Sequence, residues 1–248
     1  MGTPMDYGVV APTNADHRWA LPWKLQPLLD AVGQLVDHSG ILEVGCGTGD
    51  YLHALHDRAP HHRYRGFDIS PDMLAQARSR CPWAALAIGN ADVSFPADSD
   101  ELGLVYAVDV LHHLQDYDRF SGESVRVLRN GARLVVITDS EDDIPRRSLA
   151  ELFPATVPVN LGRYPAIEDL LDCAAAHGFH FAARRSVRGY MDLDDRFMSA
   201  LAAKALSELR LIPDSEYQRG MRRAEESRAL GGRWLSQTTV VEWTLPWP

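Results

Sequence analysis

The chain has 248 residues with 46% hydrophobic content, which favours one large α/β domain with a lid over two domains. Its formal net charge of −9 opposes general attraction to nucleic-acid phosphates, and no run of about 18 apolar residues indicates a membrane span. Three cysteines and an N-terminus without a signal-peptide pattern favour a reducing cytoplasm.

In chain order, the first recognisable strand runs directly into a glycine-rich loop. Residues 41–44 are apolar apart from Glu43 and predict a strand buried on both faces of a parallel sheet. Gly45, Gly47 and Gly49 follow on alternate positions, where a backbone without Cβ atoms can turn sharply and approach a ligand. A helix beginning after them would point its free N–H groups at that ligand. The pattern predicts a cofactor-binding loop; the alternative is an ordinary turn between strand and helix.

The spacing of this loop excludes two common nucleotide motifs. A dinucleotide fingerprint requires a third glycine where Asp50 stands, and a P-loop requires a lysine that the loop lacks. Glu43 would also repel a pyrophosphate, because like charges repel. The loop therefore favours a ligand with cationic or neutral polar groups.

Strands and helices alternate after the loop. Residues 64–68 predict a second strand that ends in Asp68, where an acid meets ribose hydroxyls in nucleotide-binding folds. Ser70 is placed to cap the next helix, and Gly131 is expected to end the helix before the fifth strand. The alternation predicts a doubly wound parallel sheet. The third, fourth and fifth strands are predicted at 84–88, 102–110 and 134–137.

The last part of the chain departs from this alternation. Residues 179–190 and 233–245 predict the sixth and seventh strands, and the roughly 40 residues between them exceed an ordinary loop. Their apolar positions predict one helix over 197–211 and another after Pro213. We expect residues 191–232 to form a helical cap or a dimer contact.

Four motifs follow one another in the order found in one protein family. The chain resembles the class I S-adenosylmethionine-dependent methyltransferases, and among them the ubiquinone- and menaquinone-biosynthesis-like group, which includes many small-molecule and natural-product enzymes. The resemblance is strongest over residues 24–140. The motifs are Glu43 with the loop of Gly45, Gly47 and Gly49, then Asp68 with Ile69, Asp92 with Val93, and the segment Leu111-His112-His113-Leu114.

The resemblance implies a complete architecture. It implies a Rossmann-like sheet of seven strands, mostly parallel with an antiparallel last strand, and a helical cap inserted between strands 6 and 7. We expect a single domain over 1–248, with an N-terminal lid at 1–23, a core at 24–190 and 233–248, and the cap at 191–232 over the acceptor. An acidic acceptor would find candidate partners in the cap and its flanks at Arg188, Tyr190, Arg219, Arg222 and Arg223.

For the methionine part of S-adenosylmethionine, the resemblance implies contact with the backbone around Gly45 and Gly47. Glu43 would orient the loop or, indirectly, the amino group of the ligand. Ala107 or Val108, at the end of the fourth strand, would line the methionine moiety.

The resemblance also implies contacts with the adenosine part and a role for the lid. Asp68 would accept hydrogen bonds from both ribose hydroxyls, and Ile69 would pack on the adenine face. Asp92 would accept from the adenine amino group while the Val93 N–H donates to a ring nitrogen. In the lid, the carboxylate of the cofactor would meet a side chain from the pair Tyr7 and Arg18.

Methyl transfer from a sulfonium requires alignment and exclusion of water more than activation. A general base is useful only where the acceptor keeps its proton near neutral pH. The candidates are His113, His112, Asp109 and His17. His113 is our first choice because it follows the fourth strand, at the edge where such sheets bind ligands; the alternative is that it braces the loop.

Two clusters of titratable residues are interpreted as surface rather than as metal sites. We therefore assign no metal. The clusters are the histidines at 53, 56, 61 and 62, and the acids Asp139, Glu141, Asp142 and Asp143, for which a cation or a basic substrate is the alternative.

The sequence thus predicts a bacterial, cytoplasmic enzyme that methylates a small molecule of secondary-metabolite or cofactor type and releases S-adenosyl-L-homocysteine. We expect no nucleic-acid or membrane partner, and a homodimer through the cap is an open alternative to a monomer. Two other functions stay open: a protein or RNA methyltransferase, and a regulatory partner or cyclase that uses the pocket without methyl transfer. The acceptor and the methylated atom do not follow from the sequence.

Overall fold

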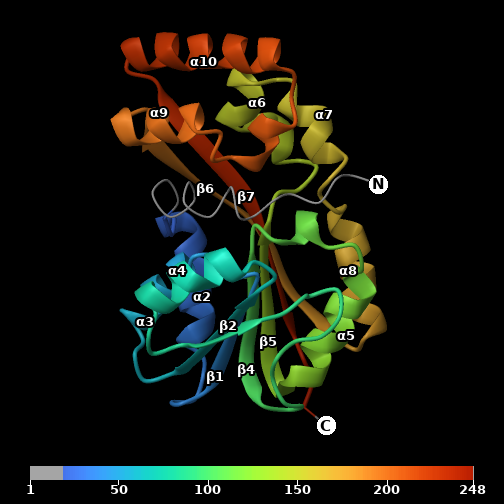
Figure 1. Cartoon of the computed structure of the whole chain (residues 1–248). Coiled ribbons are helices and arrows are strands. Elements are labelled where there is room, and N and C mark those ends of the chain that lie inside the picture. Colours follow the sequence, from blue (N-terminus) through green and yellow to red (C-terminus); the bar gives the residue numbers. More distant parts are fainter. Residues whose placement is uncertain (1–18, 248) are drawn as a thin grey trace.

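The structure, a computed structural model, describes residues 19–247. Seven strands form one sheet in the order β3-β2-β1-β4-β5-β7-β6, with helices on both of its faces (Figure 1). The strands are β1 (Gly40–Val44), β2 (Arg63–Asp68), β3 (Ala85–Ile88), β4 (Leu102–Val108), β5 (Leu128–Thr138), β6 (His180–Asp192) and β7 (Arg233–Thr244).

The pairing of the strands confirms the predicted sheet. β1 lies in parallel between β2 and β4, and the β2–β3 and β4–β5 pairs are also parallel. β7 runs antiparallel to both of its neighbours, β5 and β6. The strand order reverses between β1 and β4, and ligands of such sheets bind outside the carboxyl ends of the strands at this point.

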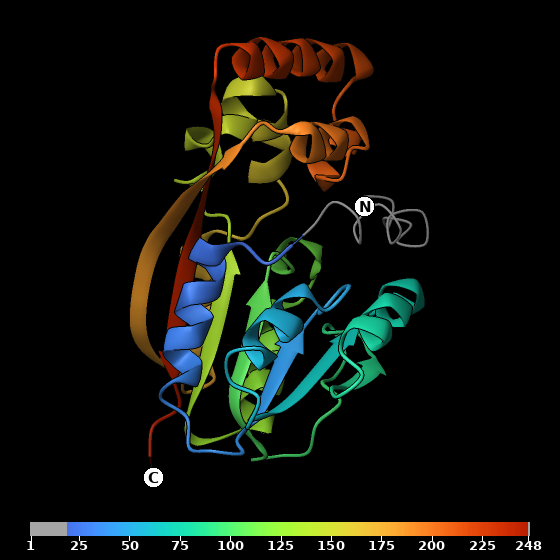
Figure 2. The ribbon, with the colours of Figure 1, turned by 90° about the vertical axis from the view of Figure 1, so that its left-hand side faces the viewer.

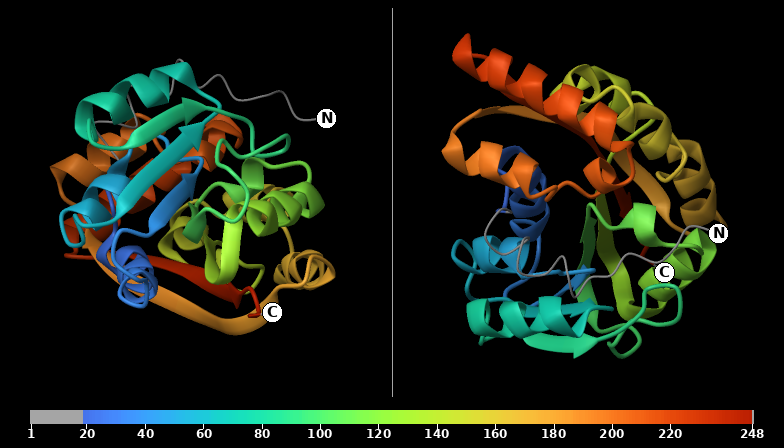
Figure 3. Two further views of the ribbon diagram at one scale, coloured as in Figure 1. Left: turned by 90° about the horizontal axis from the view of Figure 1, so that it is seen from below. Right: turned by 45° about the horizontal axis from the view of Figure 1, so that its top comes forward.

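Helices on the two faces of the sheet enclose two apolar cores (Figures 2 and 3). Leu28 and Leu52 are buried on one face, and Phe120 and Ile167 on the other. Complete burial of such a side chain contributes about 1.5–3 kcal/mol. The helices are α2 (Pro22–Val32), α3 (Asp50–His56) and α4 (Pro71–Arg80) on the first face, and α5 (Tyr117–Val127) and α8 (Ile167–Ala176) on the second.

Local sequence signals account for the start of α4. The hydroxyl of Ser70 accepts a hydrogen bond from the Met73 N–H at 3.3 Å, and Pro71 occupies the first helical position. The prediction that Ser70 caps this helix is confirmed, and such an N-terminal capping residue contributes about 1 kcal/mol to helix stability. It fixes the point where the chain leaves β2, directly after Asp68.

The prediction that Gly131 ends a helix is wrong. α5 ends at Val127, and Leu128 already belongs to β5, where it pairs with Leu102. The next pair along these strands joins Leu104 to Arg133, so the register of the pairing shifts within the intervening residues of β5. Gly131 has a φ of 75°, and a Cβ atom there would lie 2.4 Å from the ring of Trp247. The glycine lies where the register of β5 shifts and where the backbone approaches Trp247 closely, and it does not end a helix.

A second layer of helices stands above the carboxyl edge of the sheet (Figure 1). One group follows β5, the other connects β6 to β7, and a third apolar cluster joins the groups through Phe153, Phe197 and Trp234. We call these elements the upper layer. They are η2 (Ile144–Arg146), α6 (Ser148–Leu152), α7 (Thr156–Leu161), α9 (Asp195–Ala202), η3 (Ser207–Arg210) and α10 (Asp214–Ala229).

The upper layer differs from the predicted cap in two ways. The helix predicted over 197–211 is broken after Ala202, with Lys204 at a φ of 49°. The group at 144–161, which the sequence analysis did not identify, packs with the predicted insertion. The role of the layer as a cap over an acceptor stays a prediction. Within residues 19–247, no helix combines the length and apolar character needed to cross a membrane.

Candidate functional site

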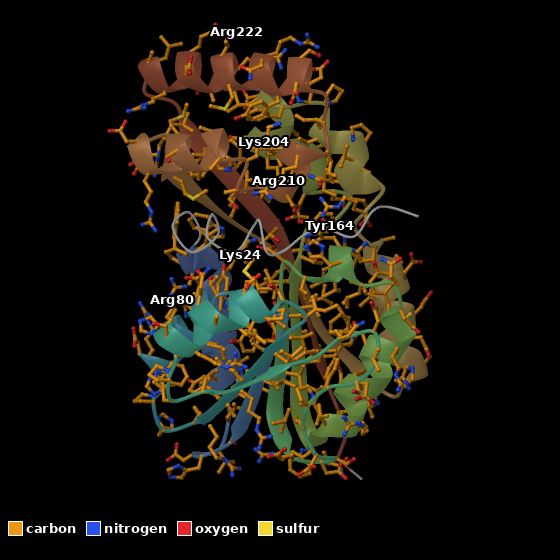
Figure 4. The ribbon with its side chains drawn as sticks, in the orientation of Figure 1. Lys24, Arg80, Tyr164, Lys204, Arg210 and Arg222 are labelled. Carbon is orange, nitrogen blue, oxygen red and sulfur yellow. The ribbon has the colours of Figure 1, made fainter. Side chains whose placement is uncertain are left out.

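A cavity of ≈ 230 Å³ lies between the carboxyl edge of the sheet and the upper layer. The glycine loop and the end of β4 form its floor, with Glu43, Gly47 and Val108 among the lining residues. Phe197 of α9 and Trp234 near the start of β7 line its opposite wall. Two further lining residues, Lys24 and Tyr164, are labelled in Figure 4 between the sheet and the upper layer.

The three loop glycines adopt left-handed backbone conformations that disfavour other residues. Gly45 has a φ of 65°, and a Cβ atom there would lie 2.3 Å from the side chain of Val110. Gly47 has a φ of 52°, yet its Cβ would meet nothing within 4 Å. Gly45 is therefore required by packing, whereas the backbone of Gly47 borders open space in the cavity.

Asp68 holds the loop from the neighbouring strand. Its Oδ2 atom accepts the Gly47 N–H and its Oδ1 atom accepts the Ser70 N–H, both at 2.9 Å. Burial raises the pKa of Asp68, and the backbone hydrogen bonds offset part of that increase. Each carboxylate oxygen keeps a lone pair that can accept another hydrogen bond. Asp68 is thus both a structural support and an available acceptor.

The next predicted pair lies on the loop after β3. Asp92 Oδ1 accepts the N–H groups of Gln115 and Asp116 at 2.8 and 3.1 Å. The Val93 N–H donates to the carbonyl of Asn90 at 2.9 Å, so its predicted bond to a ligand would require exchange of that partner.

Two apolar side chains predicted to flank the ligand are largely exposed. Ile69 is 55% exposed and Val93 is 57% exposed. Exposed large apolar side chains gain most when a flat apolar ligand covers them. Their position next to Asp68 and Asp92 in sequence fits the predicted order of contacts.

Glu43 is buried at the end of β1 and accepts the hydroxyl hydrogen bond of Tyr106 at 3.0 Å. Burial raises its pKa well above the ordinary range, the bond from Tyr106 opposes that shift, and the charges of Asp50 and Asp68 add to it. A cation entering the cavity would favour the ionised form of Glu43. The site is therefore suited electrostatically to a positively charged ligand.

The sequence analysis did not identify Lys24 as a site residue. Its ammonium group donates to both carboxylate oxygens of Asp109, at 2.7 and 2.6 Å, and its side chain is only 7% exposed. Asp109 has a φ of 52°, which is rare for a residue with a side chain. Nothing in its helical position marks Lys24 as a site residue. The available signal in the sequence was the scarcity of lysine, since Lys204 is the only other one.

The histidines after β4 are placed differently from the prediction. His112 lines the cavity, and its ring centroid lies 4.4 Å from that of Tyr164. His113, the first choice as a base, is not among the lining residues and packs against His112 at 3.9 Å between ring centroids. Geometry therefore favours His112 over His113. The predicted lid residues Tyr7, Arg18 and His17 lie outside the described residues.

The acids after β5 divide into two kinds: Glu141 and Asp142 are exposed, as predicted, whereas Asp139 and Asp143 are buried, contrary to the prediction. Asp139 and Asp143 are 4% and 2% exposed. Burial alone would raise the pKa of Asp143. The hydrogen bonds from Thr239, Gln237 and two serines lower that pKa by more than burial raises it, so the net shift is downward. Asp139 forms an ion pair with Arg147, a cavity-lining residue that the sequence analysis missed.

The arginines predicted to meet an acidic acceptor do not line the cavity. Arg219 pairs with Glu216 and Arg223 donates to the Leu152 carbonyl, while Arg222 points outward on α10 in Figure 4. Within residues 19–247, no group of three or more His, Cys, Asp or Glu residues is arranged to hold a metal ion.

Comparison with known proteins places this site in context. A family model described as "Methyltransferase domain" matches residues 42–136. Malonyl-[acyl-carrier protein] O-methyltransferase of Hahella chejuensis is 30% identical over 152 residues, which cover 59% of this chain and 53% of that protein. Demethylmenaquinone methyltransferase of Thermus thermophilus is 35% identical over 100 residues, which cover 39% and 46%. The chain spans about half the length of these relatives.

A solved structure from Anabaena variabilis, assigned by its description to an antibiotic biosynthesis pathway as a methyltransferase, superposes with a TM-score of 0.69. The two chains are 16% identical, and the match covers 89% of this chain and 96% of the other. At that identity the likeness concerns the fold, and it covers more of the chain than the family model, which matches residues 42–136.

Proposed function

We propose that the chain is a class I S-adenosylmethionine-dependent methyltransferase and that it transfers the methyl group of S-adenosylmethionine to a small-molecule acceptor, as the family model over residues 42–136 and the methyltransferase relatives suggest. One observation carries the proposal: Asp68 accepts the Gly47 N–H from the neighbouring strand, and Gly47 lines a cavity that upper-layer residues line from the other side. The relatives named above act on very different acceptors, so the acceptor of this chain is argued from its own cavity.

The residues that follow β2 and β3 do not line the cavity itself, but they fit the adenosine part of the cofactor beside it. Asp68 keeps one acceptor position on each oxygen for the two ribose hydroxyls. Ile69 and Val93 offer exposed apolar surface to the adenine ring. Asp92 offers its Oδ2 atom to the adenine amino group, since the N–H groups of Gln115 and Asp116 both donate to Oδ1.

The ion pair of Lys24 and Asp109 fits the zwitterionic end of the cofactor. Both residues line the cavity, as do Gly45 and Gly47. A carboxylate can pair with the ammonium group of Lys24, and an amino group can pair with Asp109, so one ion pair exchanges for two. We assign the carboxylate to Lys24 in place of, or together with, the lid residues Tyr7 and Arg18.

When bound, S-adenosylmethionine supplies an electrophilic methyl group on a positively charged sulfur. The residues of the chain then have three tasks: to hold that sulfur, to orient the acceptor and to keep out water. Asp109 and Glu43 in the cavity wall would stabilise the positive charge, Glu43 in the ionised form that a bound cation favours. Phe197 and Trp234 shield the opposite wall from water.

Proton removal from the acceptor is assigned to His112 if the acceptor requires it. His112 lines the cavity, and neutral imidazole can accept a proton near pH 7. A small-molecule acceptor is favoured over a protein or RNA because the upper layer covers the site with apolar side chains. A cytoplasmic location and a homodimer through residues 191–232 stay predictions.

Calorimetric titration of the full chain with S-adenosylmethionine tests the cofactor assignment. We expect saturable binding by the wild type and at least about tenfold weaker binding by Asp68→Asn, which loses the charge that ribose hydroxyls favour. Asp57→Asn changes an exposed acid paired with His53 and serves as the matched control. No binding by the wild type, or equal binding by Asp68→Asn, would contradict the assignment.

A further inference from the structure

Arg147 has an unused hydrogen-bonding edge at the cavity wall. Its side chain is 11% exposed, and its Nη1 atom donates to Asp139. The Nε and Nη2 atoms, which form another edge of the guanidinium, are buried and have no hydrogen-bond partner within residues 19–247. Nη2 lies 3.9 Å from Glu208 Oε1, beyond hydrogen-bond distance. Buried N–H donors are nearly always satisfied, so this edge calls for a partner.

The chemistry of that edge selects the partner. Burial lowers the pKa of Arg147, but the carboxylates of Asp139 and Glu208 raise it above its ordinary value, so the guanidinium stays charged. Two parallel N–H groups match the two oxygens of a carboxylate, whereas a carboxamide offers only one oxygen. A phosphate monoester would bring nearly two negative charges next to Asp139 and Glu208, which disfavours it.

The surroundings of Arg147 define the rest of the ligand. Leu149, Phe197, Leu206 and Trp234 line the same cavity, and all of them belong to or pack against the apolar cluster of the upper layer. These apolar side chains beside the charged fork of Arg147 favour a ligand that has an apolar body and one polar head.

We propose that the acceptor is a small carboxylic acid with an apolar body, and that Arg147 binds its carboxylate through Nε and Nη2. This inference rests on the proposed function, because it assigns the acceptor of the same site. Arg147 is then a specificity-determining residue. Glu208 opposes the incoming negative charge and limits the affinity.

Titration of the full chain saturated with S-adenosylhomocysteine tests the proposal with two matched pairs of probes: benzoate with benzamide, and hexanoate with hexanamide. In at least one pair, we expect the wild type to bind the carboxylate about tenfold more tightly than the amide. Arg147→Lys keeps the charge without the fork, and it should reduce this preference to about threefold or less. Arg163→Lys is the matched control, because Arg163 donates to Ser207 at 3.2 Å and does not line the cavity.

A second variant keeps the test decisive if Arg147→Lys does not fold. Glu208→Gln retains Arg147 and removes the opposing charge, so carboxylate binding should strengthen by about twofold to fivefold. The proposal is overturned if the wild type binds no carboxylate at about 10 mM or binds the amides with equal affinity. It is also overturned if phenyl phosphate binds more tightly than benzoate, or if Glu208→Gln leaves carboxylate binding unchanged or weakens it. A preference that survives in folded Arg147→Lys also overturns it. Failure of the wild type to bind S-adenosylhomocysteine would instead contradict the proposed function.

Discussion

Lys24 of α2 and Asp109, which directly follows β4, form an ion pair that lines the cavity. The Lys24 Nζ atom lies 2.7 and 2.6 Å from the two carboxylate oxygens of Asp109. The pair joins a helix on the surface of the sheet to the strand end at the topological switch point. It therefore couples the shape of the ligand site to the packing of α2.

Replacement of Lys24 by methionine should weaken binding of S-adenosylhomocysteine by about tenfold or more, because the cofactor carboxylate loses its cation. Binding of 5′-methylthioadenosine, which lacks the amino-acid end, should change by less than about twofold. Calorimetry with both ligands checks the difference. Lys204→Met removes an exposed pair with Asp214 and should leave both affinities unchanged. An equal loss for both ligands would show a general distortion of the site instead.

Glu43 should make stability fall as pH rises. Its pKa is raised in the folded protein, so the folded state holds a proton that the unfolded state releases above the ordinary range. Stability is then lost as pH rises from the unfolded pKa towards the raised folded one. Between about pH 5 and pH 8, the melting temperature of the wild type should fall more than that of Glu43→Gln. Parallel melting curves for the two proteins would exclude a raised pKa at Glu43.

Alanine at two glycines should separate folding from binding. Gly45→Ala introduces a Cβ atom against Val110 and should lower the melting temperature more than Gly47→Ala. Gly47→Ala costs about 1–2 kcal/mol of backbone strain but meets no atom within 4 Å, so the protein should fold while cofactor binding is weakened. Thermal melts together with calorimetry measure both effects. The reverse order of melting temperatures would contradict the assigned packing of Gly45.

The two histidines after β4 should contribute unequally to turnover. His112→Gln should lower the rate by about 10²-fold or more if the acceptor must lose a proton, whereas His113→Gln should change it much less. Both variants should bind the cofactor like the wild type. Rates are measured with the acceptor fraction that the wild type labels. A larger loss for His113→Gln would restore the prediction made from the sequence.

The parts of the fold that sequence patterns predict are those set by local chemistry. Buried strands are recognisable as apolar runs, and the pair Ser70-Pro71 indicates the start of a helix. Both patterns depend only on residues that are neighbours in the sequence. Gly131 was misassigned because the ring that leaves no room for a Cβ atom there belongs to Trp247, more than a hundred residues away in the sequence. The break after Ala202 was likewise hidden in a continuous apolar pattern.

The cofactor side of the site follows from short motifs, but the acceptor side does not. Asp68 and Gly47 are recognisable because their spacing reflects one loop and one strand. Lys24 and Arg147 become site residues only when α2 and the segment after β5 fold over the sheet edge, and their pairing with Asp109 and Asp139 is invisible in the sequence. Long-range packing decides these positions.

The most direct measurement of the central claim is incubation of the full chain with methyl-labelled S-adenosylmethionine and a bacterial small-molecule extract. We expect label to appear in a compound of low molecular mass, with an equal amount of S-adenosylhomocysteine formed, and Asp68→Asn to lose most of this transfer. Cofactor binding without any transfer, or label found only in protein or RNA, would contradict the proposed function.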